Sequence, residues 1–513
     1  MSDWTFPHDL KKQRRFVLFL LCFAAAALAL GVSPHWRISP DSALYAGMAR
    51  SIATGEGYAF AGVPQTSIPP AVPLYFSAAW SLANVVHPHA SVMQAAGFLN
   101  IFTGVAGFLG IIAAFYLAVE ISGLSRTVVA LALLVTSARY FSAAIEPLTD
   151  VPFAAVSIAA ILFLLRFQRR GRRGDAVAAA VFLALTPLVR VAGVALVASA
   201  AAIYLLRARR PGASARDGHL FYATVPALCV TAFFSPFLFA KSPSSFNYIS
   251  DITVGRGAWE IARGVALNLT GMPGYLFEAV FGFESALGLS YALLALVILG
   301  AAALWRRGWK LPVTYAAAYV LFVALAYPVL PRYFIPVLLF VFLFMVEGVV
   351  AAAAWCQTKS RLITGGTVTV VASTCLVIIL ATNLFYVARE VGRNFSNDFY
   401  SSYKRGRYHD YIEAASNIRR KRPAGRIMAL QSRIIFALTG VETVWIPWHP
   451  DARRRPTNDE LARYVRGNRV TLMVVDARDP ESAAIFVNFI RTGPLRWRVI
   501  GHYGAVTLFA LSP

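Results

Sequence analysis

Four clusters of polar residues, each directly beside a long apolar segment, hold the side chains that could do chemistry. The first cluster starts at Pro40 and Asp41 and continues through Tyr45 to the turn Gly55-Glu56-Gly57-Tyr58. If Pro40 opens a short helix that runs to about residue 54, Tyr45 lies one turn from Asp41 and both can face one cleft. A carboxylate there can take a proton from a substrate, or can simply complement the dipole of the helix.

The second and third clusters lie farther along the chain. Glu146 and Asp150 stand in the segment Glu146-Pro147-Leu148-Thr149-Asp150, where carboxylates beside a low-dielectric region are costly unless they are paired or functional. Asp150 has the structural alternative of capping the next helix, whereas Glu146 has no comparable role. Arg190 is a single cation at the tip of an apolar hairpin, where it can either reach the membrane interface or bind an anion.

The fourth cluster is Arg332-Tyr333, followed by Pro336. A guanidinium at the level of the lipid headgroups suits a phosphate, because its planar fork binds phosphate oxygens in pairs. An aromatic anchor at the interface is the structural alternative for Tyr333. Each cluster is weak evidence alone, and together they matter only if the chain brings them to the same face.

The composition predicts a helical membrane protein. The chain has 513 residues, of which 58% are hydrophobic and 14% charged, with a mean hydropathy of +0.59. A soluble protein would have about a quarter of its residues charged. Apolar runs of about 20 residues are long enough to span a bilayer as helix. We predict eleven spans, at about 16–33, 92–118, 123–141, 150–166, 176–189, 191–206, 218–240, 286–304, 312–329, 333–353 and 363–386.

The basic residues predict the orientation of these spans. With a cytoplasmic amino terminus and an uncleaved first helix, the inner loops hold nineteen Lys and Arg residues, and the outer loops before residue 387 hold eight. Segment 176–206 is expected to break into a hairpin near Pro187 and Arg190, because both flanking basic clusters should be cytoplasmic. This topology places all four polar clusters on the outer face.

The chain divides into two parts. Residues 1–386 form the predicted transmembrane catalytic domain, with a first outer loop at about 34–91. In residues 387–513, strands near 426–430, 444–446, 470–475 and 506–509 alternate with helices near 408–420 and 458–466. This alternation predicts a small extracytoplasmic α/β domain on the same face as Asp41.

The charge and the cysteines exclude several classes of protein. Much of the net charge of +23 lies in short loops between apolar spans, which speaks against nucleic acid as a partner. The four cysteines lie in or beside apolar runs and form no CxxC pair, so neither a disulfide framework nor a zinc site is indicated. In the first outer loop only His35, Asp41 and Glu56 could bind a divalent metal, so the sequence leaves metal dependence open.

These segments resemble the C-type glycosyltransferases (GT-C) that use polyprenyl-phosphate sugars. The group includes bacterial aminoarabinose transferases of lipid A, protein O-mannosyltransferases and the sugar transferases of rhizobial lipopolysaccharide cores. The resemblance covers roughly residues 10–350. One departure is Ile68-Pro69-Pro70, because members often have a basic residue before the paired prolines, and this weakens the case for phosphate contacts from that loop. The matching pieces are Pro40-Asp41 with Tyr45, Gly55 to Tyr58, Glu146/Asp150-x-Pro152, Arg190-x-x-Gly193 and Arg332-Tyr333-x-x-Pro336.

The resemblance implies an inverting hexosyl- or pentosyltransferase at the outer face of a bacterial inner membrane. Its donor would be a polyprenyl-phosphate sugar and its acceptor a lipid, a glycan or a protein. Asp41 would be the general base, and Arg332, with Arg190 as a candidate second cation, would neutralise the phosphate. No motif demands a cofactor, although a divalent cation is a candidate ligand. The remaining matched residues are assigned to substrate binding, with Glu146 and Asp150 orienting the acceptor or the cation: Tyr45, Glu56, Tyr58, Glu146, Asp150 and Tyr333.

Two other functions remain open at this stage. A transporter or flippase of a lipid-linked saccharide would place ionisable residues near the middle of the bilayer, and Glu347 is the single acid well inside a predicted span. A membrane scaffold that displays residues 387–513 would need no site of its own. The long first loop and the external domain favour an enzyme.

Overall fold

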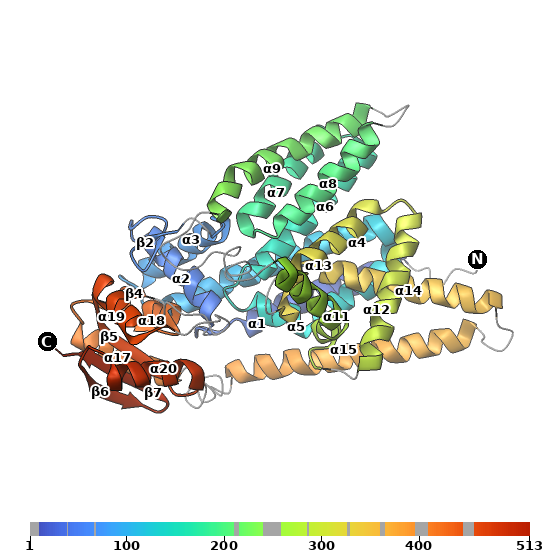
Figure 1. Ribbon diagram of the computed structural model, residues 1–513. Helices are drawn as coiled ribbons and strands as arrows, with labels where there is room; N and C mark the ends of the chain where they lie inside the picture. Colours follow the sequence, from blue (N-terminus) through green and yellow to red (C-terminus); the bar gives the residue numbers. More distant parts are fainter. Residues whose placement is uncertain are drawn as a thin grey trace.

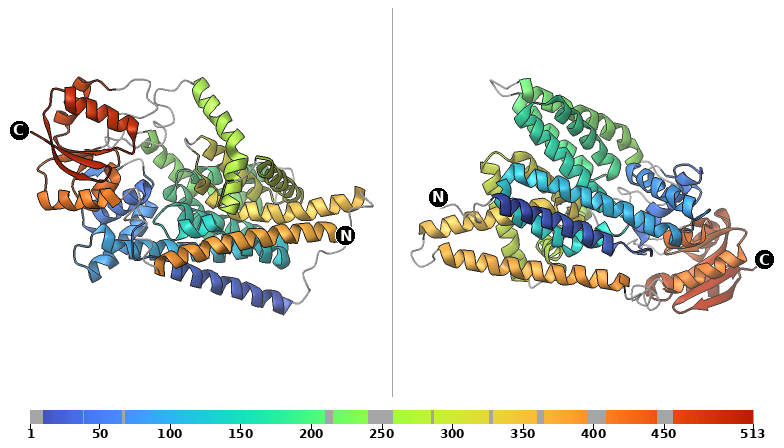
Figure 2. Two further views of the ribbon diagram at one scale, coloured as in Figure 1. Left: turned by 90° about the horizontal axis from the view of Figure 1, so that it is seen from below. Right: turned by 180° about the vertical axis from the view of Figure 1, so that it is seen from behind.

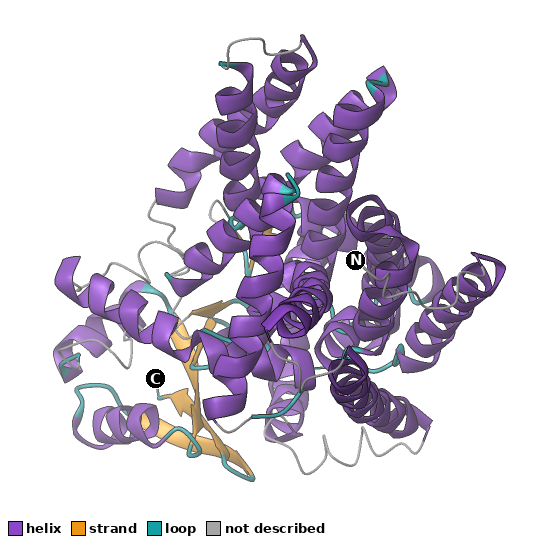
Figure 3. Cartoon of the chain, turned by 90° about the vertical axis from the view of Figure 1, so that its right-hand side faces the viewer, coloured by secondary structure: helices purple, strands orange, loops and turns teal. Residues whose placement is uncertain are grey.

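The protein is a helical bundle with a small α/β unit at one end, as Figures 1 and 3 show. The computed structural model describes residues 10–37, 39–65, 68–209, 215–239, 258–284, 287–325, 329–359, 365–395, 409–444 and 456–512. Some predicted positions fall outside these ranges, namely residues 240, 286, 326–328, 363, 364, 408, 445 and 446. The predicted fold class, a polytopic helical membrane protein with a C-terminal α/β region, is confirmed.

Six of the described helices are long and apolar enough to span a bilayer, and shorter apolar helices pack beside them. The six are α1, α4, α6, α12, α14 and α15. The bundle consists of α1 (Leu10–Gly31), α4 (Val92–Thr136), α5 (Ala138–Ala144), α6 (Asp150–Arg170), α7 (Arg173–Val189), α8 (Gly193–Ala208), α9 (Ala215–Phe239), α11 (Ala258–Phe281), α12 (Leu287–Arg306), α13 (Lys310–Ala324), the 3-10 helix η1 (Pro331–Val337), α14 (Leu338–Lys359) and α15 (Gly365–Phe395).

Two breaks in the bundle follow the sequence prediction. The 45 residues of α4 are interrupted at Gly123, whose φ of 73° and ψ of 173° only glycine adopts readily, between the predicted spans 92–118 and 123–141. The predicted hairpin is also present, because α7 ends at Val189, α8 starts at Gly193, and the two helices pack together. A Cβ atom on Gly193 would lie 2.3 Å from the carbonyl carbon of Thr186, so this tight turn requires glycine.

Two features of the bundle differ from the sequence prediction. Helix α11 lies in a segment that was expected to be a loop, because Pro273 and the charged residues Glu260, Arg263 and Glu278 interrupt its apolar pattern. Helix α15 continues to Phe395, beyond the predicted end of its span at 386. The last turns of α15 are polar but remain helical through backbone hydrogen bonds. Hydropathy identifies only the apolar part of such a helix.

The first outer segment is ordered around a short helix, as predicted. It contains α2 (Pro40–Ala53), the two-residue strands β1 (Ala59–Phe60) and β2 (Val63–Pro64), and α3 (Ala71–Val86). Helix α2 starts with a capping box, in which the Ser42 backbone N–H donates to Ser39 Oγ and the Ser39 N–H donates to Ser42 Oγ. Trp36 Nε1 also donates to Ser42 Oγ at 3.0 Å, which joins the end of the first span to this helix.

The C-terminal unit is a sheet with helices on both faces. Its strand order is β4-β3-β5-β7-β6, parallel in β4-β3-β5 and antiparallel in β5-β7-β6. The predicted helices and strands are present, including Thr457 as the cap of α19, and α18, α20 and β6 are additional. The elements are α17 (His409–Lys421), β3 (Arg426–Ala429), α18 (Ser432–Thr439), β4 (Thr443–Val444), α19 (Asn458–Gly467), β5 (Val470–Asp476), α20 (Pro480–Thr492), β6 (Trp497–Tyr503) and β7 (Val506–Leu511).

The C-terminal unit docks on the first outer segment through α18 and α2. The Phe436 ring of α18 lies 4.7 Å from the Phe60 ring, edge to face. Gly47 of α2 leaves room for both rings, since a Cβ atom there would lie 2.6 Å from Phe60 and 3.1 Å from Phe436. Figures 1 and 2 show the red C-terminal sheet beside the blue α2 and far from the start of α1. The α/β unit and Asp41 therefore lie at the same end of the molecule.

Gly47→Ala should destabilise the protein although alanine favours helix. Overpacking the Phe60–Phe436 contact costs about 1–3 kcal/mol, and the gain in helix propensity is about 1 kcal/mol. We expect a lower Tm for the detergent-solubilised variant than for the wild type. The control is Gly174→Ala in α7, where the new Cβ meets nothing within 4 Å and Tm should not fall. Equal Tm values for Gly47→Ala and the wild type would show that this contact is loosely packed.

Candidate functional site

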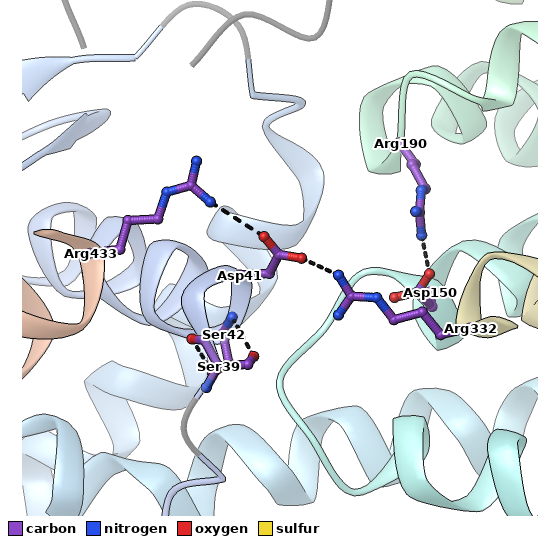
Figure 4. Close-up of polar contacts among 7 residues, drawn as sticks. All are labelled: Ser39, Asp41, Ser42, Asp150, Arg190, Arg332 and Arg433. Atoms are coloured by element: carbon purple, nitrogen blue, oxygen red, sulfur yellow. Dashed lines mark hydrogen bonds and ion pairs between the residues drawn. The ribbon is translucent and has the colours of Figure 1, made fainter. Parts of the chain in front are cut away.

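The carboxylate of Asp41 lies between two arginines that come from opposite sides (Figure 4). Asp41 is in the first turn of α2, Arg332 is in η1, and Arg433 is in the first turn of α18. Arg332 Nη2 donates to Asp41 Oδ2, and Arg433 Nη1 lies 3.3 Å from Asp41 Oδ1. The Asp41 side chain is still 36% exposed, so a substrate hydroxyl can reach it.

Arg332 is fixed by the irregular backbone that precedes α14. Pro331 opens the 3-10 turn and Pro336 lies within it, and the Tyr333 N–H donates to the carbonyl of Leu330 at 2.9 Å. This turn packs on α6 and α11. The prolines restrict the backbone, and the Arg332 side chain therefore starts from a fixed point at the mouth of the bundle.

A second ion pair lies beside the first. Arg190, the residue that caps the end of α7, donates to Asp150 at the start of α6, and the Asp150 side chain is only 3% exposed. The guanidinium carbons of Arg190 and Arg332 lie 5.2 Å and 5.6 Å from the centre of the Tyr333 ring. Two guanidinium groups near one aromatic face form a cationic site that suits an oxyanion such as phosphate.

Glu146 lies in the turn between α5 and α6 and forms a side-chain hydrogen bond with Ser39, the cap of α2. Burial raises the pKa of Glu146 above its ordinary value, and the charges of Arg332 and Arg37 and the hydrogen bond with Ser39 only partly oppose this shift. The negative charge of Asp41 raises it further. Glu146 therefore keeps its proton to a higher pH than an ordinary glutamate does, and in the protonated form it can donate a hydrogen bond.

The pKa of Asp41 shifts in the opposite direction. Burial acts to raise it, but the charges of Arg332, Arg433 and Arg190 and the hydrogen bond from Arg332 together hold the pKa below its ordinary value. Asp41 is therefore ionised at neutral pH, as a general base must be. A site with one ionised and one neutral carboxyl group can accept one proton and donate a different one.

The other three predicted residues lie in the first outer segment. Tyr45 is 6% exposed and belongs to the hydrophobic core beneath α2. Tyr58 donates to the carbonyl of Ile68 at 2.7 Å, which closes the loop, and burial raises its pKa. Glu56 is exposed after the end of α2 and accepts a hydrogen bond from Ser51 at 3.1 Å. Their assignment to substrate binding stays a prediction.

Arg433 is the residue of the site that sequence reasoning missed. It follows directly after strand β3, which is the first strand of the parallel part of the sheet, with β4 on one side and β5 on the other. Sites in open α/β sheets form outside the carboxyl end of such a strand, where the strand order reverses. The segment Gln431-Ser432-Arg433 after a predicted strand could therefore have been singled out from the sequence.

The geometry suits an anion better than a divalent cation. Asp150 and Asp41 are each paired with arginine, and the raised pKa of Glu146 disfavours a metal ligand. Among the described residues, no group of three or more His, Cys, Asp or Glu side chains could hold a metal ion.

Comparison with known proteins relates the chain to a fold but not to a sequence family. No protein-family model matches the sequence, and no curated protein matches it. The structure resembles ArnT from Cupriavidus metallidurans bound to undecaprenyl phosphate, with a TM-score of 0.58 and 15% identity over 96% of this chain and 97% of that one. It also resembles the oligosaccharyltransferase AglB from Archaeoglobus fulgidus, solved with an inhibitory peptide and a dolichol-phosphate, with a TM-score of 0.56 and 12% identity over 96% and 74% of the chains.

The chain has the GT-C fold. The apo form of Cupriavidus metallidurans ArnT matches equally well, with a TM-score of 0.58 and 14% identity over 97% of this chain and 98% of that one. The match extends over nearly the whole of both chains, so it includes the C-terminal α/β unit as well as the helical bundle. The resemblance to C-type glycosyltransferases seen in the sequence is thus confirmed at the level of the fold.

Glu146→Gln should stabilise the protein increasingly as the pH rises. A carboxyl group with a raised pKa contributes fully to stability below its unfolded pKa, near 4.5, and that contribution is lost as the pH rises through the folded value. Glutamine stays neutral throughout. We expect the Tm of Glu146→Gln minus that of the wild type to grow as the pH rises above the ordinary glutamate pKa of 4.5.

The control for this experiment is Glu56→Gln, an exposed acid of the same outer segment. Its Tm should follow that of the wild type at every pH. Parallel curves for Glu146→Gln and the wild type would contradict the raised pKa that we assign to Glu146.

Proposed function

We propose that this protein is an inverting glycosyltransferase that moves a sugar from a polyprenyl-phosphate donor to a hydroxyl group of a lipid, glycan or protein. The observation that carries this proposal is the Asp41–Arg332 pair, a reachable carboxylate held against a guanidinium at the mouth of a helical bundle. The base and the phosphate-binding cation required for the transfer are thus in contact.

The reaction follows from this placement. The oxygen of the acceptor hydroxyl attacks the anomeric carbon from the side opposite the phosphate, and a new C–O bond forms with inversion. The bond between the anomeric carbon and the phosphate oxygen breaks, and its electron pair stays on that oxygen. Asp41 takes the proton of the attacking hydroxyl. Arg332 and Arg190 stabilise the phosphate as its charge increases.

The charges of the site match those of this reaction. The site contains six ionisable side chains: Asp41, Glu146, Asp150, Arg190, Arg332 and Arg433. When Glu146 is protonated, which its raised pKa favours, three arginines face two aspartates, and one positive charge is left for the single negative charge of a donor phosphodiester. When Asp41 takes a proton, its negative charge is lost, and the net charge of the arginines and aspartates rises from one positive charge to two. The released phosphate monoester gains its second negative charge in the same step.

The structural relatives support the class of the donor. ArnT was solved bound to undecaprenyl phosphate, and the oligosaccharyltransferase AglB was solved with a dolichol-phosphate. In this chain the guanidinium groups of Arg332 and Arg190 lie near one ring, that of Tyr333, where α7 ends and η1 begins. A lipid phosphate bound there would leave its polyprenyl chain among the helices.

The position of Glu347 speaks against the hypothesis that the protein is a transporter. This acid is fully buried and is paired with Arg126 and Arg307, so it joins α14 to α4 and α12. A carboxylate with two arginine partners is a structural clamp and not a free binding group on a pathway. A scaffold, in turn, has no need of a partly exposed carboxylate flanked by three arginines.

Asp41→Asn and Arg332→Gln should impair different steps of the reaction. Asparagine keeps the size of aspartate and one oxygen that can accept from an arginine, but it takes no proton, so kcat should fall by about 10²–10⁴-fold with donor KM little changed. Loss of a charge-assisted contact to phosphate costs about 1.5–3 kcal/mol, so Arg332→Gln should raise donor KM by about 10- to 150-fold. The assay is the transfer of radiolabelled sugar from a polyprenyl-phosphate donor to membrane acceptors.

The matched control is Asp459→Asn. Asp459 occupies the same second helical position in α19 as Asp41 does in α2, but on the far face of the C-terminal sheet. Its loss should leave transfer unchanged. Near wild-type turnover by Asp41→Asn would overturn the mechanism and would return the transporter to first place.

We further propose that the protein lies in a bacterial inner membrane with a cytoplasmic amino terminus and an extracytoplasmic C-terminal unit. The basic loops support this orientation. The contact between α18 and α2 places the C-terminal unit on the same side of the membrane as Asp41. A phosphatase reporter fused after Pro513 should therefore be active. Activity of a reporter that works only in the cytoplasm would reverse the orientation.

A further inference from the structure

The proposed reaction makes two demands on Arg332. In the structure this arginine donates to Asp41 Oδ2, yet it must also contact the phosphate of the donor. When the guanidinium turns to the phosphate, Asp41 loses the partner of one oxygen. A general base needs a fixed orientation at that moment, because proton transfer depends on hydrogen-bond geometry. Another group must then hold the carboxylate.

Arg433 is placed to do so. Its Nη1 lies 3.3 Å from Asp41 Oδ1, the oxygen that Arg332 does not hold, and its side chain is 10% exposed. Figure 4 shows it approaching Asp41 from the side opposite Arg332. A phosphate that draws Arg332 away therefore leaves the Arg433 contact in place.

The backbone around Arg433 is held by buried neighbours and by a hydrogen bond. Ile434 and Ile435, the next two residues of α18, are fully buried, and Thr443 Oγ1 donates to the carbonyl of Ser432 at 3.1 Å. One turn farther along α18, Phe436 packs on Phe60 of the outer segment. A side chain that starts from a fixed helix loses little entropy when it holds its partner.

We infer that Arg433 is a positioning residue for the transfer, supplied by the C-terminal unit, which holds the Asp41 carboxylate in place while Arg332 binds the donor phosphate. This inference rests on the proposed function and extends it. The catalytic base lies in one part of the chain and the group that orients it lies in the other. The site is therefore incomplete unless α18 is docked on α2.

The test uses the full-length protein with Arg433→Gln, which keeps a polar side chain with an N–H donor but is shorter and removes the charge and the fork of donors. We expect kcat to fall by about 10- to 100-fold, as for loss of one charge-assisted hydrogen bond, with donor KM changed less than about threefold. Arg433→Lys keeps the charge without the fork, so its kcat should lie between those of Arg433→Gln and the wild type.

The pH profile separates orientation of the base from simple docking. The charges facing Asp41 come from Arg332 on η1, Arg190 at the end of α7 and Arg433 on α18, and Glu146 faces it from the turn before α6. Loss of one cation raises the pKa of Asp41, so Arg433→Gln should lose activity earlier as the pH falls. We expect the acidic limb of kcat to move up by about one pH unit.

Two control variants complete the experiment. Phe436→Ala loosens the docking but keeps the charge of Arg433, so it should lower Tm and should move the acidic limb less than Arg433→Gln does. Arg426→Gln removes an arginine of the same unit that pairs with Glu442 at 2.7 Å, and it should leave kcat and the pH profile unchanged. If Arg433→Gln fails to fold, the kcat of Arg433→Lys is the deciding measurement. If Arg433 served only the stability of the fold, a folded Arg433→Lys variant would have the wild-type kcat.

Each contrary outcome has a distinct meaning. Unchanged kcat and pH profile in Arg433→Gln, with an active wild type, would overturn this inference and leave the proposed function standing. A raised acceptor KM with unchanged kcat would also overturn it, and would make Arg433 part of the acceptor site. A wild type that transfers no sugar from any polyprenyl-phosphate donor would overturn the proposed function and this inference together.

Discussion

An ionised carboxylate at the edge of an apolar bundle is the constraint on which this structure depends. Asp41 can stay charged there only because arginines compensate for the loss of water. Those arginines come from η1 and from α18, which are separated by about a hundred residues of sequence. Much of the architecture at this end of the molecule, including the capping of α2 and the proline-rich turn before α14, fixes the distances between these groups.

The same rule operates at the opposite end of the bundle with a different result. Glu347 is buried and paired with Arg126 and Arg307, and Glu120 is paired with Arg169 and Arg170. These acids are fully satisfied by their neighbours and hold helices together. The site around Asp41 differs in access, because the Asp41 side chain is 36% exposed whereas Glu347 is fully buried. Access to the carboxylate, and not the presence of ion pairs, is what distinguishes this site.

The C-terminal unit takes part in the site and is not an appendage. Its docking through Phe436 on Phe60 and past Gly47 is tight, and the helix that docks also carries Arg433. Because the hydrophobic core runs without interruption from the bundle to α17 and α18, the two units support each other. In open α/β sheets, ligands bind outside the carboxyl ends of the parallel strands. Here Arg433, which follows such a strand, contacts the carboxylate of Asp41 in the other unit.

The sequence by itself determined the class of fold, the hairpin at Pro187, the helix at Asp41 and the cap Thr457, because hydropathy, glycine, proline and capping act over a few residues. It also singled out Asp41, Glu146, Asp150, Arg190 and Arg332, since charges beside apolar spans are costly. Only the tertiary structure decided which acid meets which arginine. Those pairings join residues up to 392 positions apart, which local patterns do not encode. The opposite pKa shifts of Asp41 and Glu146, and the contribution of Arg433, therefore follow from packing alone.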